Sequence, residues 1–435
     1  MRSTRGIRKF PRGFLAGCFS AALIAAVGCS SLSPSAPSPP EVRTPPRANV
    51  QPTVETDDRH WRYALVIDAS SSASAMQIYQ WHPRGGDRLP RIEAAPFPRN
   101  AERQAWELKV KPGLGDYGGR PDDAARSLAP LIDFALEKIG SDPATLAMTS
   151  LFLRATAGMR LLPPAEQEEI IASIRRSFAD LPFASSSARV ISGHEEGTYG
   201  WIGANYLLGH LEHGGAFPTV GALDLGGAST QITFVPLDYP LKHGQAVTIG
   251  TNTYHLYTYS YLGLGQDQAR AHVDSDACFI RGYPLADGGF GTGDFDACRT
   301  AIRETFTAPC DEGPCSLFGT YQPPLYGDFL ASSVYAYAAD FFDLGQRLEP
   351  QALAAKGTAF CSQDWNAMVA ADPGVADNPY LPTYCYAAAH ITTLLTDGFG
   401  FSDTTERITA PLRVQGSSVG WALGALVYEL AGDGD

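Results

Sequence analysis

The feature that most constrains the fold is a short pattern that occurs twice in the chain, 156 residues apart. The segments ALVIDASSSASAMQIY (64–79) and GALDLGGASTQITF (221–234) each run from apolar residues into one aspartate, Asp68 or Asp224. Small residues follow, and then alternating residues that indicate a returning strand, which together predict a β-hairpin. Two copies in one chain predict a duplicated lobe with the two hairpins facing each other.

Patterns elsewhere in the chain predict a mixed α/β fold. Apolar alternation and helical periodicity indicate strands at 63–68, 75–81, 105–111 and 188–192 and helices at 122–139, 164–179 and 416–430. Strands that alternate with helices in this way form layered α/β domains. At 435 residues, the chain is long enough to contain two of them.

The first 28 residues differ from the rest and predict a secretory signal. Five basic residues precede an apolar run at 14–27, which is too short to span a bilayer. Gly28-Cys29 at its end resembles a bacterial lipobox, so we expect Cys29 to be lipidated; a plain signal peptide is the alternative. Residues 29–58 are rich in proline and serine and would form a tether that cannot pack.

Charge excludes one class of partner. Removing residues 1–28, with five basic and no acidic residues, changes the formal charge from −13 to −18, and such a surface would repel nucleic acid. An anionic substrate would therefore need a metal ion or backbone N–H groups at its site.

Six cysteines lie in the second half of the chain, and an even number in an exported protein predicts disulfides. Sequence order favours the pairs Cys278–Cys298, Cys310–Cys315 and Cys361–Cys385, although six cysteines allow about fifteen pairings. A zinc site is the alternative, but no pair has the Cys-x2-Cys spacing.

Two facing aspartate hairpins could bind a metal ion together with phosphate groups. Their small-residue turns would expose backbone N–H groups and let phosphate oxygens approach closely. Asp68 and Asp224 would meet at the base of a cleft and hold a hydrated Mg²⁺, which binds through one or two carboxylates plus phosphates. Either aspartate alone could simply end a strand.

Other segments carry further candidate side chains. Glu196, in HEEGTYG before an apolar helix, could accept a proton from an attacking water. Alternatively, Glu195 and Glu196 could both favour a helix N-terminus through its dipole. Gln231 could orient the same water or face solvent from a strand. In ATAGMRLL, Thr156 could contact water or phosphate, and Arg160 could form a structural ion pair.

Five of these segments, in order, resemble the apyrase conserved regions of the nucleoside triphosphate diphosphohydrolases, the ecto-apyrase family. They are IDASSSASAMQIYQW, ATAGMRLL, SGHEEGTYGWIGANYLLG, ALDLGGASTQITF and VGWALGALVY, and the similarity extends from about residue 60 to 430. The resemblance implies two actin-like (RNase H-like) lobes with the active site in the interlobe cleft. Lobe I would comprise 59–190 and 414–435, and lobe II would comprise 191–413. It also implies hydrolysis of the terminal phosphates of nucleoside tri- and diphosphates.

The resemblance assigns roles to single residues by position. Glu196 would be the catalytic base, and the residues that position the water or support the nucleophile would be Ser229, Gln231 and Thr156. Asp68 and Asp224 would anchor Mg²⁺ or Ca²⁺ through water, with Trp421 near the metal. Phosphates would bind at Ser71, Ser72, Ala73, Ser74, Gly226, Gly227 and Ala228. The nucleobase would stack on Tyr337 or, as a second choice, Tyr380; core packing is the alternative for both.

The sequence departs from the family pattern in the first turn. Ser70 stands where the family usually has glycine, and Ala73 where it has glycine or histidine. A side chain at Ser70 is tolerable only if its φ is negative. The alternatives to an apyrase are an exopolyphosphatase or a nucleotide-binding lipoprotein with weakened catalysis. We expect a monomer in the bacterial cell envelope, at the outer membrane or facing the periplasm, or else a secreted protein.

Overall fold

The computed structural model describes residues 61–84, 88–96, 105–212, 218–240, 242–311 and 313–432. The signal, the lipidation site and the tether predicted above lie outside these residues. The described residues belong to one compact unit, Asp57–Asp435.

The first sheet has the strand order β3-β2-β1-β5-β6, and β4 also pairs with β2. Its strands are β1 (Arg62–Ala69), β2 (Ser74–His82), β3 (Arg91–Ala94), β4 (Glu107–Val110), β5 (Ser150–Ala155) and β6 (Ser185–Val190). β1 and β2 form an antiparallel hairpin, whereas β1, β5 and β6 run parallel. Because β1 is central and covered on both faces, its residues 64–67 are all buried and apolar instead of alternating.

The second sheet repeats this plan in the order β12-β11-β7-β8-β10-β9. Its strands are β7 (Gly221–Leu225), β8 (Ser229–Phe234), β9 (Gly244–Ile249), β10 (Asn252–Leu262), β11 (Phe329–Ser333) and β12 (Ile408–Thr409). The run β10-β8-β7-β11-β12 matches β3-β2-β1-β5-β6 in every strand direction, with a hairpin next to two parallel strands. The duplicated lobe predicted from the two aspartate segments is therefore confirmed.

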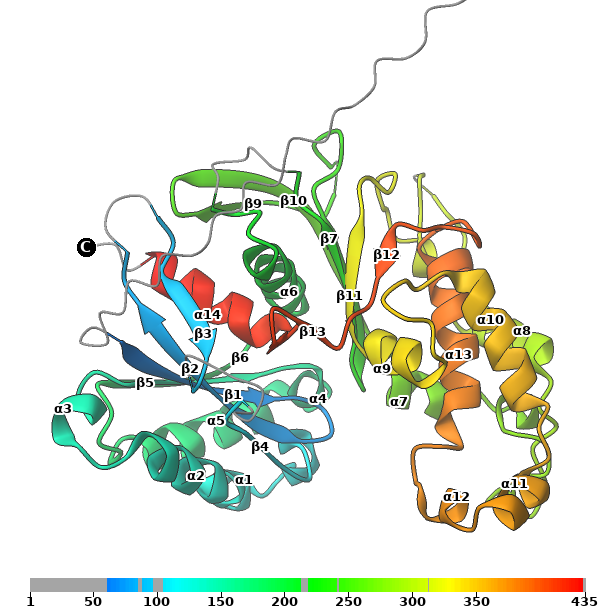
Figure 1. The fold of residues 1–435 in the computed structure, drawn as a ribbon, viewed down its shortest axis with the longest axis horizontal. Helices are drawn as coiled ribbons and strands as arrows, with labels where there is room; N and C mark the ends of the chain where they lie inside the picture. The colour runs from blue at the N-terminus through cyan, green and yellow to red at the C-terminus, as the bar shows by residue number, and fades with distance from the viewer. Residues whose placement is uncertain are drawn as a thin grey trace, which may run out of the picture. The chain divides into compact units, whose positions relative to one another are not determined.

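Helices cover the faces of both sheets, as Figure 1 shows. The first sheet carries α1 (Pro121–Ser127), α2 (Ala129–Ile139), α3 (Pro143–Leu146), α4 (Ala157–Arg160) and α5 (Pro164–Phe178). The second carries α7 (Gln266–Ala271), α8 (Phe295–Phe306), α9 (Val334–Phe341), α10 (Pro350–Cys361), α11 (Trp365–Ala371), α12 (Gly374–Asp377) and α13 (Thr383–Thr393). Each sheet packs with its helices around an apolar core of its own.

Two further helices, α6 (Gly193–Leu207) and α14 (Trp421–Gly432), form a third apolar cluster with residues of β1, β9 and β10. Their backbones are in contact. A Cβ added to Gly424 would lie 1.7 Å from the carbonyl oxygen of Tyr199, and one added to Gly203 would lie 2.7 Å from that of Gly420. Because only glycine permits this approach, α14 holds α6, and the glutamates at its start, in a fixed position.

Some element boundaries differ from those predicted. The single helix expected over 122–139 is divided at Leu128, because Pro130 lies in the first turn of α2 and could not continue α1. The helix expected over 416–430 begins only at Trp421, since β13 (Arg413–Val414) and β14 (Ser417–Ser418) form a small hairpin before it. The strand expected over 188–192 ends at Val190.

All six cysteines of the second half form disulfides, with the pairs Cys278–Cys298, Cys310–Cys315 and Cys361–Cys385. The pairing favoured by sequence order is therefore confirmed, and the zinc alternative is wrong for these residues.

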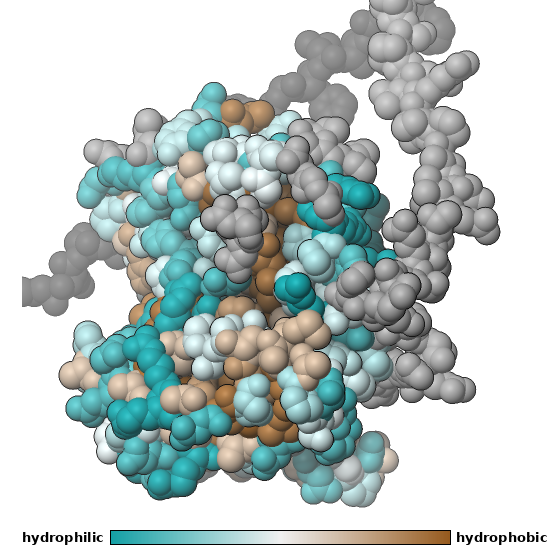
Figure 2. Space-filling view, turned by 90° about the vertical axis from the view of Figure 1, so that its left-hand side faces the viewer, coloured by the Kyte–Doolittle hydropathy of each residue, from teal (hydrophilic) through white to brown (hydrophobic). Residues whose placement is uncertain are grey.

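Within the described part of the chain, no helix combines the length and apolar character needed to cross a membrane. The face in Figure 2 has mostly hydrophilic residues at its edges, and hydrophobic residues are visible near its middle.

A buried histidine joins α13 to α7 and predicts a pH dependence of stability. His390 is 0% exposed, its Nδ1 lies 3.3 Å from Oε1 of Gln266, and burial lowers its pKa to about 3. Above its ordinary pKa, neither folded nor unfolded chain binds a proton there. As the pH falls below about 6.5, the unfolded chain does, so the wild type should lose about 1.4 kcal/mol of unfolding free energy per pH unit through this group. Urea unfolding of wild type and His390→Gln at pH 7, 6 and 5 measures this.

The variant should lose less stability than the wild type over that pH range, with the difference between the two constant above pH 7. Equal losses on acidification would show that His390 becomes protonated in the folded chain.

Candidate active site

The structure brings together three carboxyl groups from three separate elements. Asp68 and Asp224 lie near the carboxyl ends of β1 and β7, where ligand sites of α/β sheets form, and Glu196 lies in the first turn of α6. Burial, and then the charges of Glu196 and Asp224, raise the pKa of Asp68 to about 8. Burial also raises the pKa of Glu196 to about 7, with a contribution from Asp224 and against the charge of Arg160. The charge of Asp224 on the second sheet therefore acts on both Asp68 of the first sheet and Glu196 of α6.

The small-residue turns of the two hairpins also meet. A Cβ added to Gly227 of the second turn would lie 2.5 Å from Oγ of Ser71 in the first. The backbone of Ser71 is itself packed closely, since a Cβ on Gly158 would lie 2.6 Å from its Cα. Ser70 keeps a negative φ, so its side chain is accommodated without strain. The predicted phosphate-binding turns thus form one continuous surface of small residues.

Two neighbouring glutamates at the start of α6 have different environments. Glu195 completes a capping box, in which its backbone N–H donates to Oγ of Ser192 (3.1 Å) and its Oε2 accepts from the backbone N–H of Ser192 (2.8 Å). Arg189 also donates to Oε1 of Glu195, at 2.7 Å. Glu196, one residue later, is 7% exposed and lies on the side of the carboxylates. The helix-terminus interpretation therefore holds for Glu195, and the side chain of Glu196 has other partners.

Those partners form a buried polar network. Nη2 of Arg160 donates to Oε2 of Glu196 at 2.8 Å, and Nε2 of Gln231 donates to the same oxygen at 3.1 Å. Nε2 of Gln231 also lies 2.7 Å from Oγ of Ser229 and 3.0 Å from Oγ of Ser260. Gln231 is 2% exposed, so its interpretation as a solvent-facing strand residue is wrong. A water hydrogen-bonded to this network would lie against a carboxylate held by an amide and a guanidinium.

The aspartates fit a hydrated divalent cation. Oδ1 of Asp68 is buried, and no group among the described residues forms a hydrogen bond with it. Ser332 donates to Oδ1 of Asp224 at 3.1 Å, and hydrogen bonds from Ser333 and from the backbone of Leu225 also favour the ionised form of that carboxyl group. No group of three or more His, Cys, Asp or Glu side chains in the described residues is arranged to hold a metal directly. Mg²⁺ keeps most of its water ligands and binds proteins through one or two carboxylates, so two aspartates without further ligands suit it.

The other residues predicted for the site lie on several different elements and differ in their exposure. Thr156 is buried, directly precedes α4 and donates its backbone N–H to the carbonyl oxygen of Ala69. Trp421 begins α14 and is buried in the cluster with α6. Tyr337 on α9 and Tyr380 before α13 are 60% and 57% exposed, so core packing is wrong for both. Tyr380 accepts a hydrogen bond from Lys111.

Some residues that contact the site were not predicted from the sequence motifs. Ser332 contacts Asp224 from 108 positions away, and Ser260 contacts Gln231 from β10. The following Ser333 has a φ of 58°, a conformation that non-glycine residues adopt mostly where surrounding structure imposes it. Arg160, expected from the sequence as a member of a structural ion pair, forms one with Glu196 at 2.8 Å, so that interpretation is confirmed.

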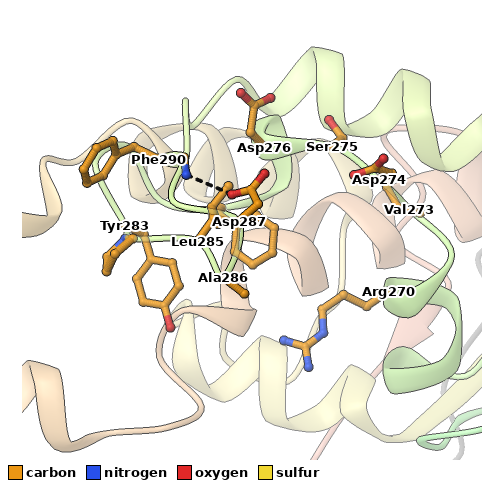
Figure 3. A pocket seen from close by; sticks show the side chains of 13 residues that line it. Arg270, Val273, Asp274, Ser275, Asp276, Tyr283, Leu285, Ala286, Asp287 and Phe290 are labelled. Carbon is orange, nitrogen blue, oxygen red and sulfur yellow. Dashed lines mark hydrogen bonds between the residues drawn. The ribbon is translucent and has the colours of Figure 1, made fainter.

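A separate pocket of about 980 Å³ lies beyond the end of α7. Figure 3 shows Arg270, Tyr283, Asp287 and Phe290 around it. None of the predicted site residues lines this pocket, so it is distinct from the carboxylate cluster.

Comparison with known proteins covers nearly the whole described chain. The GDA1/CD39 (nucleoside phosphatase) family matches residues 54–280 and 286–433. An ectonucleoside triphosphate diphosphohydrolase 1 of Rattus norvegicus is 32% identical over 427 residues, covering 84% of this chain and 80% of that protein. A probable apyrase 6 of Arabidopsis thaliana is 30% identical over 414 residues, covering 85% and 72%. The structure of a nucleoside triphosphate hydrolase from Neospora caninum is similar in fold, with a TM-score of 0.57, 16% identity and coverage of 86% and 93%.

Proposed function

The chain belongs to the GDA1/CD39 (nucleoside phosphatase) family, and on that premise we propose that it is an apyrase. It hydrolyses the terminal phosphates of nucleoside tri- and diphosphates to the monophosphate. The observation that carries this proposal is the convergence of Glu196, Asp68 and Asp224 where the two small-residue turns meet.

The reaction is an attack by water on the terminal phosphorus, in which the protein positions the reactants and offsets charge. Glu196 takes the proton of the water as general base. Gln231 and Ser229, which are hydrogen-bonded to each other and close to Glu196, orient the same water, and Thr156 supports it. Phosphate oxygens bind backbone N–H groups and hydroxyls of the two turns.

Asp68 and Asp224 would hold the divalent cation, Mg²⁺ or Ca²⁺, through its water molecules, and Trp421 would lie nearby. When bound, the cation offsets the negative charge that develops on the transferred phosphate. Tyr337, exposed on α9, is the surface on which the base stacks.

We place the protein outside the cytoplasm, as a monomer attached to the cell envelope through lipidated Cys29. Three disulfides in the described chain support an oxidising compartment. Metabolic labelling with a fatty acid, followed by comparison with Cys29→Ser, tests the anchor.

Phosphate release from ATP, ADP and polyphosphate, each measured with and without EDTA, tests the activity. We expect release from ATP and ADP that EDTA abolishes and excess Mg²⁺ or Ca²⁺ restores. Replacement of Tyr337 by alanine should weaken nucleotide turnover only. Release from polyphosphate alone, unaffected by that replacement, would favour an exopolyphosphatase. Nucleotide binding without release would instead indicate a binding protein.

A further inference from the structure

Two exposed lysines, Lys109 and Lys111, lie at the end of β4 that is nearer to the carboxylates. Lys109 of β4 pairs in register with Ala75 of β2, and Ala75 pairs with Asp68 of β1. Residues in register across neighbouring strands share one face, so Lys109 and Asp68 lie on the same side of the sheet. The charge of Lys109 accordingly lowers the pKa of Asp68, against the larger effects of burial and of the carboxylates. Lys111, two residues further on, lies roughly 7 Å farther along the chain direction.

The backbone that carries Lys111 is fixed against the first turn. A Cβ added to Gly113 would lie 2.3 Å from the carbonyl oxygen of Ser71 and 2.9 Å from that of Ser70. The segment 111–113 therefore packs directly on the turn predicted to bind phosphate, and Lys111 has a defined starting point beside it.

The ammonium group of Lys111 is held from the other half of the molecule. Its Nζ donates to Oη of Tyr380 at 2.9 Å and lies 5.5 Å from the centre of the tyrosine ring. The charge of Asp267 also acts on Lys111, after the stronger effect of Tyr380. Asp267 lies in the first turn of α7, and its backbone N–H donates to the carbonyl oxygen of Gly227, in the small-residue turn of the second hairpin, at 2.9 Å. Lys111 thus lies beside both turns, with a partner that is neutral and exposed.

We propose that Lys111, held by Tyr380, binds the phosphate two places before the scissile one, which a triphosphate has and a diphosphate lacks, and so sets the preference between triphosphates and diphosphates. This inference rests on the proposed apyrase function. The terminal phosphate lies at the carboxylates, next to Lys109, and the rest of the phosphate chain extends outward past Lys111. A triphosphate presents one more charged phosphate in that direction than a diphosphate does. A lysine acts there as a point charge, and its neutral partner Tyr380 leaves that charge unneutralised.

The test compares steady-state kinetics of Lys111→Met with those of the wild type for ATP and ADP. We expect KM for ATP to rise about tenfold, as for one lost hydrogen bond to a charged group, with KM for ADP changed less than about twofold. The value of kcat should stay within about twofold for both, because the contact is made equally in ground and transition states. Lys111→Arg should retain the wild-type preference. Tyr380→Phe should shift KM in the same direction as Lys111→Met, but by less.

The matched control is Lys356→Met, which removes an exposed lysine from α10 in the same half as Tyr380 and should change neither KM. Equal changes for ATP and ADP, or none, would overturn the proposal. A wild type that releases no phosphate from either nucleotide would refute the apyrase function instead. In that case, the role of Lys111 is tested by comparing the dissociation constants of ATP and ADP between the wild type and Lys111→Met. Weaker binding of ATP alone would support the role, and unchanged binding of both nucleotides would reject it.

Discussion

Replacing Glu196 by glutamine is expected to reduce phosphate release from ATP and ADP by about 10²–10⁴-fold, the usual contribution of a general base. Glutamine has nearly the same shape as glutamate and can remain packed beside Arg160 and Gln231. It cannot take a proton from water. Nucleotide binding should persist, because the turns and aspartates that bind phosphate and cation are unchanged. Phosphate release and nucleotide binding by calorimetry, measured on the same preparation, separate the two effects.

The chain offers a matched control in the adjacent residue. Glu195→Gln removes the same charge from the same helical turn, but Glu195 serves the capping box and Arg189. We expect a loss of roughly 1 kcal/mol in stability, as for a helix cap, with kcat within about threefold of the wild type. If Glu196→Gln also remained within about threefold of the wild type, another group would have to be the base.

Replacing Arg160 by methionine should have the largest effect on stability among the site residues. The pair Arg160–Glu196 is buried, with side-chain exposures of 14% and 8% and an N···O distance of 2.8 Å. Removing one partner leaves an unpaired buried charge, which costs about 3–5 kcal/mol. Arg160 is also the main influence that lowers the pKa of Glu196, so its loss should move the acidic limb of the pH–rate profile upward by about one unit or more. Urea unfolding and the pH dependence of kcat measure both.

Two further variants make this prediction specific. Arg160→Met in a Glu196→Gln background should cost much less stability, because no buried carboxylate is then left unpaired. Arg154→Met breaks another ion pair, the one between the buried Arg154 and the partly exposed Glu429 of α14, and should lower stability without moving the pH–rate profile. A shift of the profile in Arg154→Met would show that the pH effect comes from general loosening of the fold.

The local elements were predictable because their signals are local. The hairpins at Asp68 and Asp224 follow from apolar strands, small turns and returning alternation, and the structure has both. The disulfide pairing followed chain order because each bridge joins cysteines at most 24 residues apart. The division of the 122–139 helix was missed although Pro130 signals it, since the apolar periodicity continues across the break.

The sequence by itself determined that this chain repeats an aspartate hairpin and carries the motifs of a nucleotide-hydrolysing family, because those properties reside in short contiguous segments. Only the tertiary structure decided which side chains meet. It separated Glu195 from Glu196, joined Arg160 to Glu196 over 36 residues, and placed Lys111 against Tyr380 over 269. Such contacts depend on how whole elements pack, here on α6 held against α14 through glycines and on two sheets whose turns touch. The spacing of residues along the chain does not contain that information.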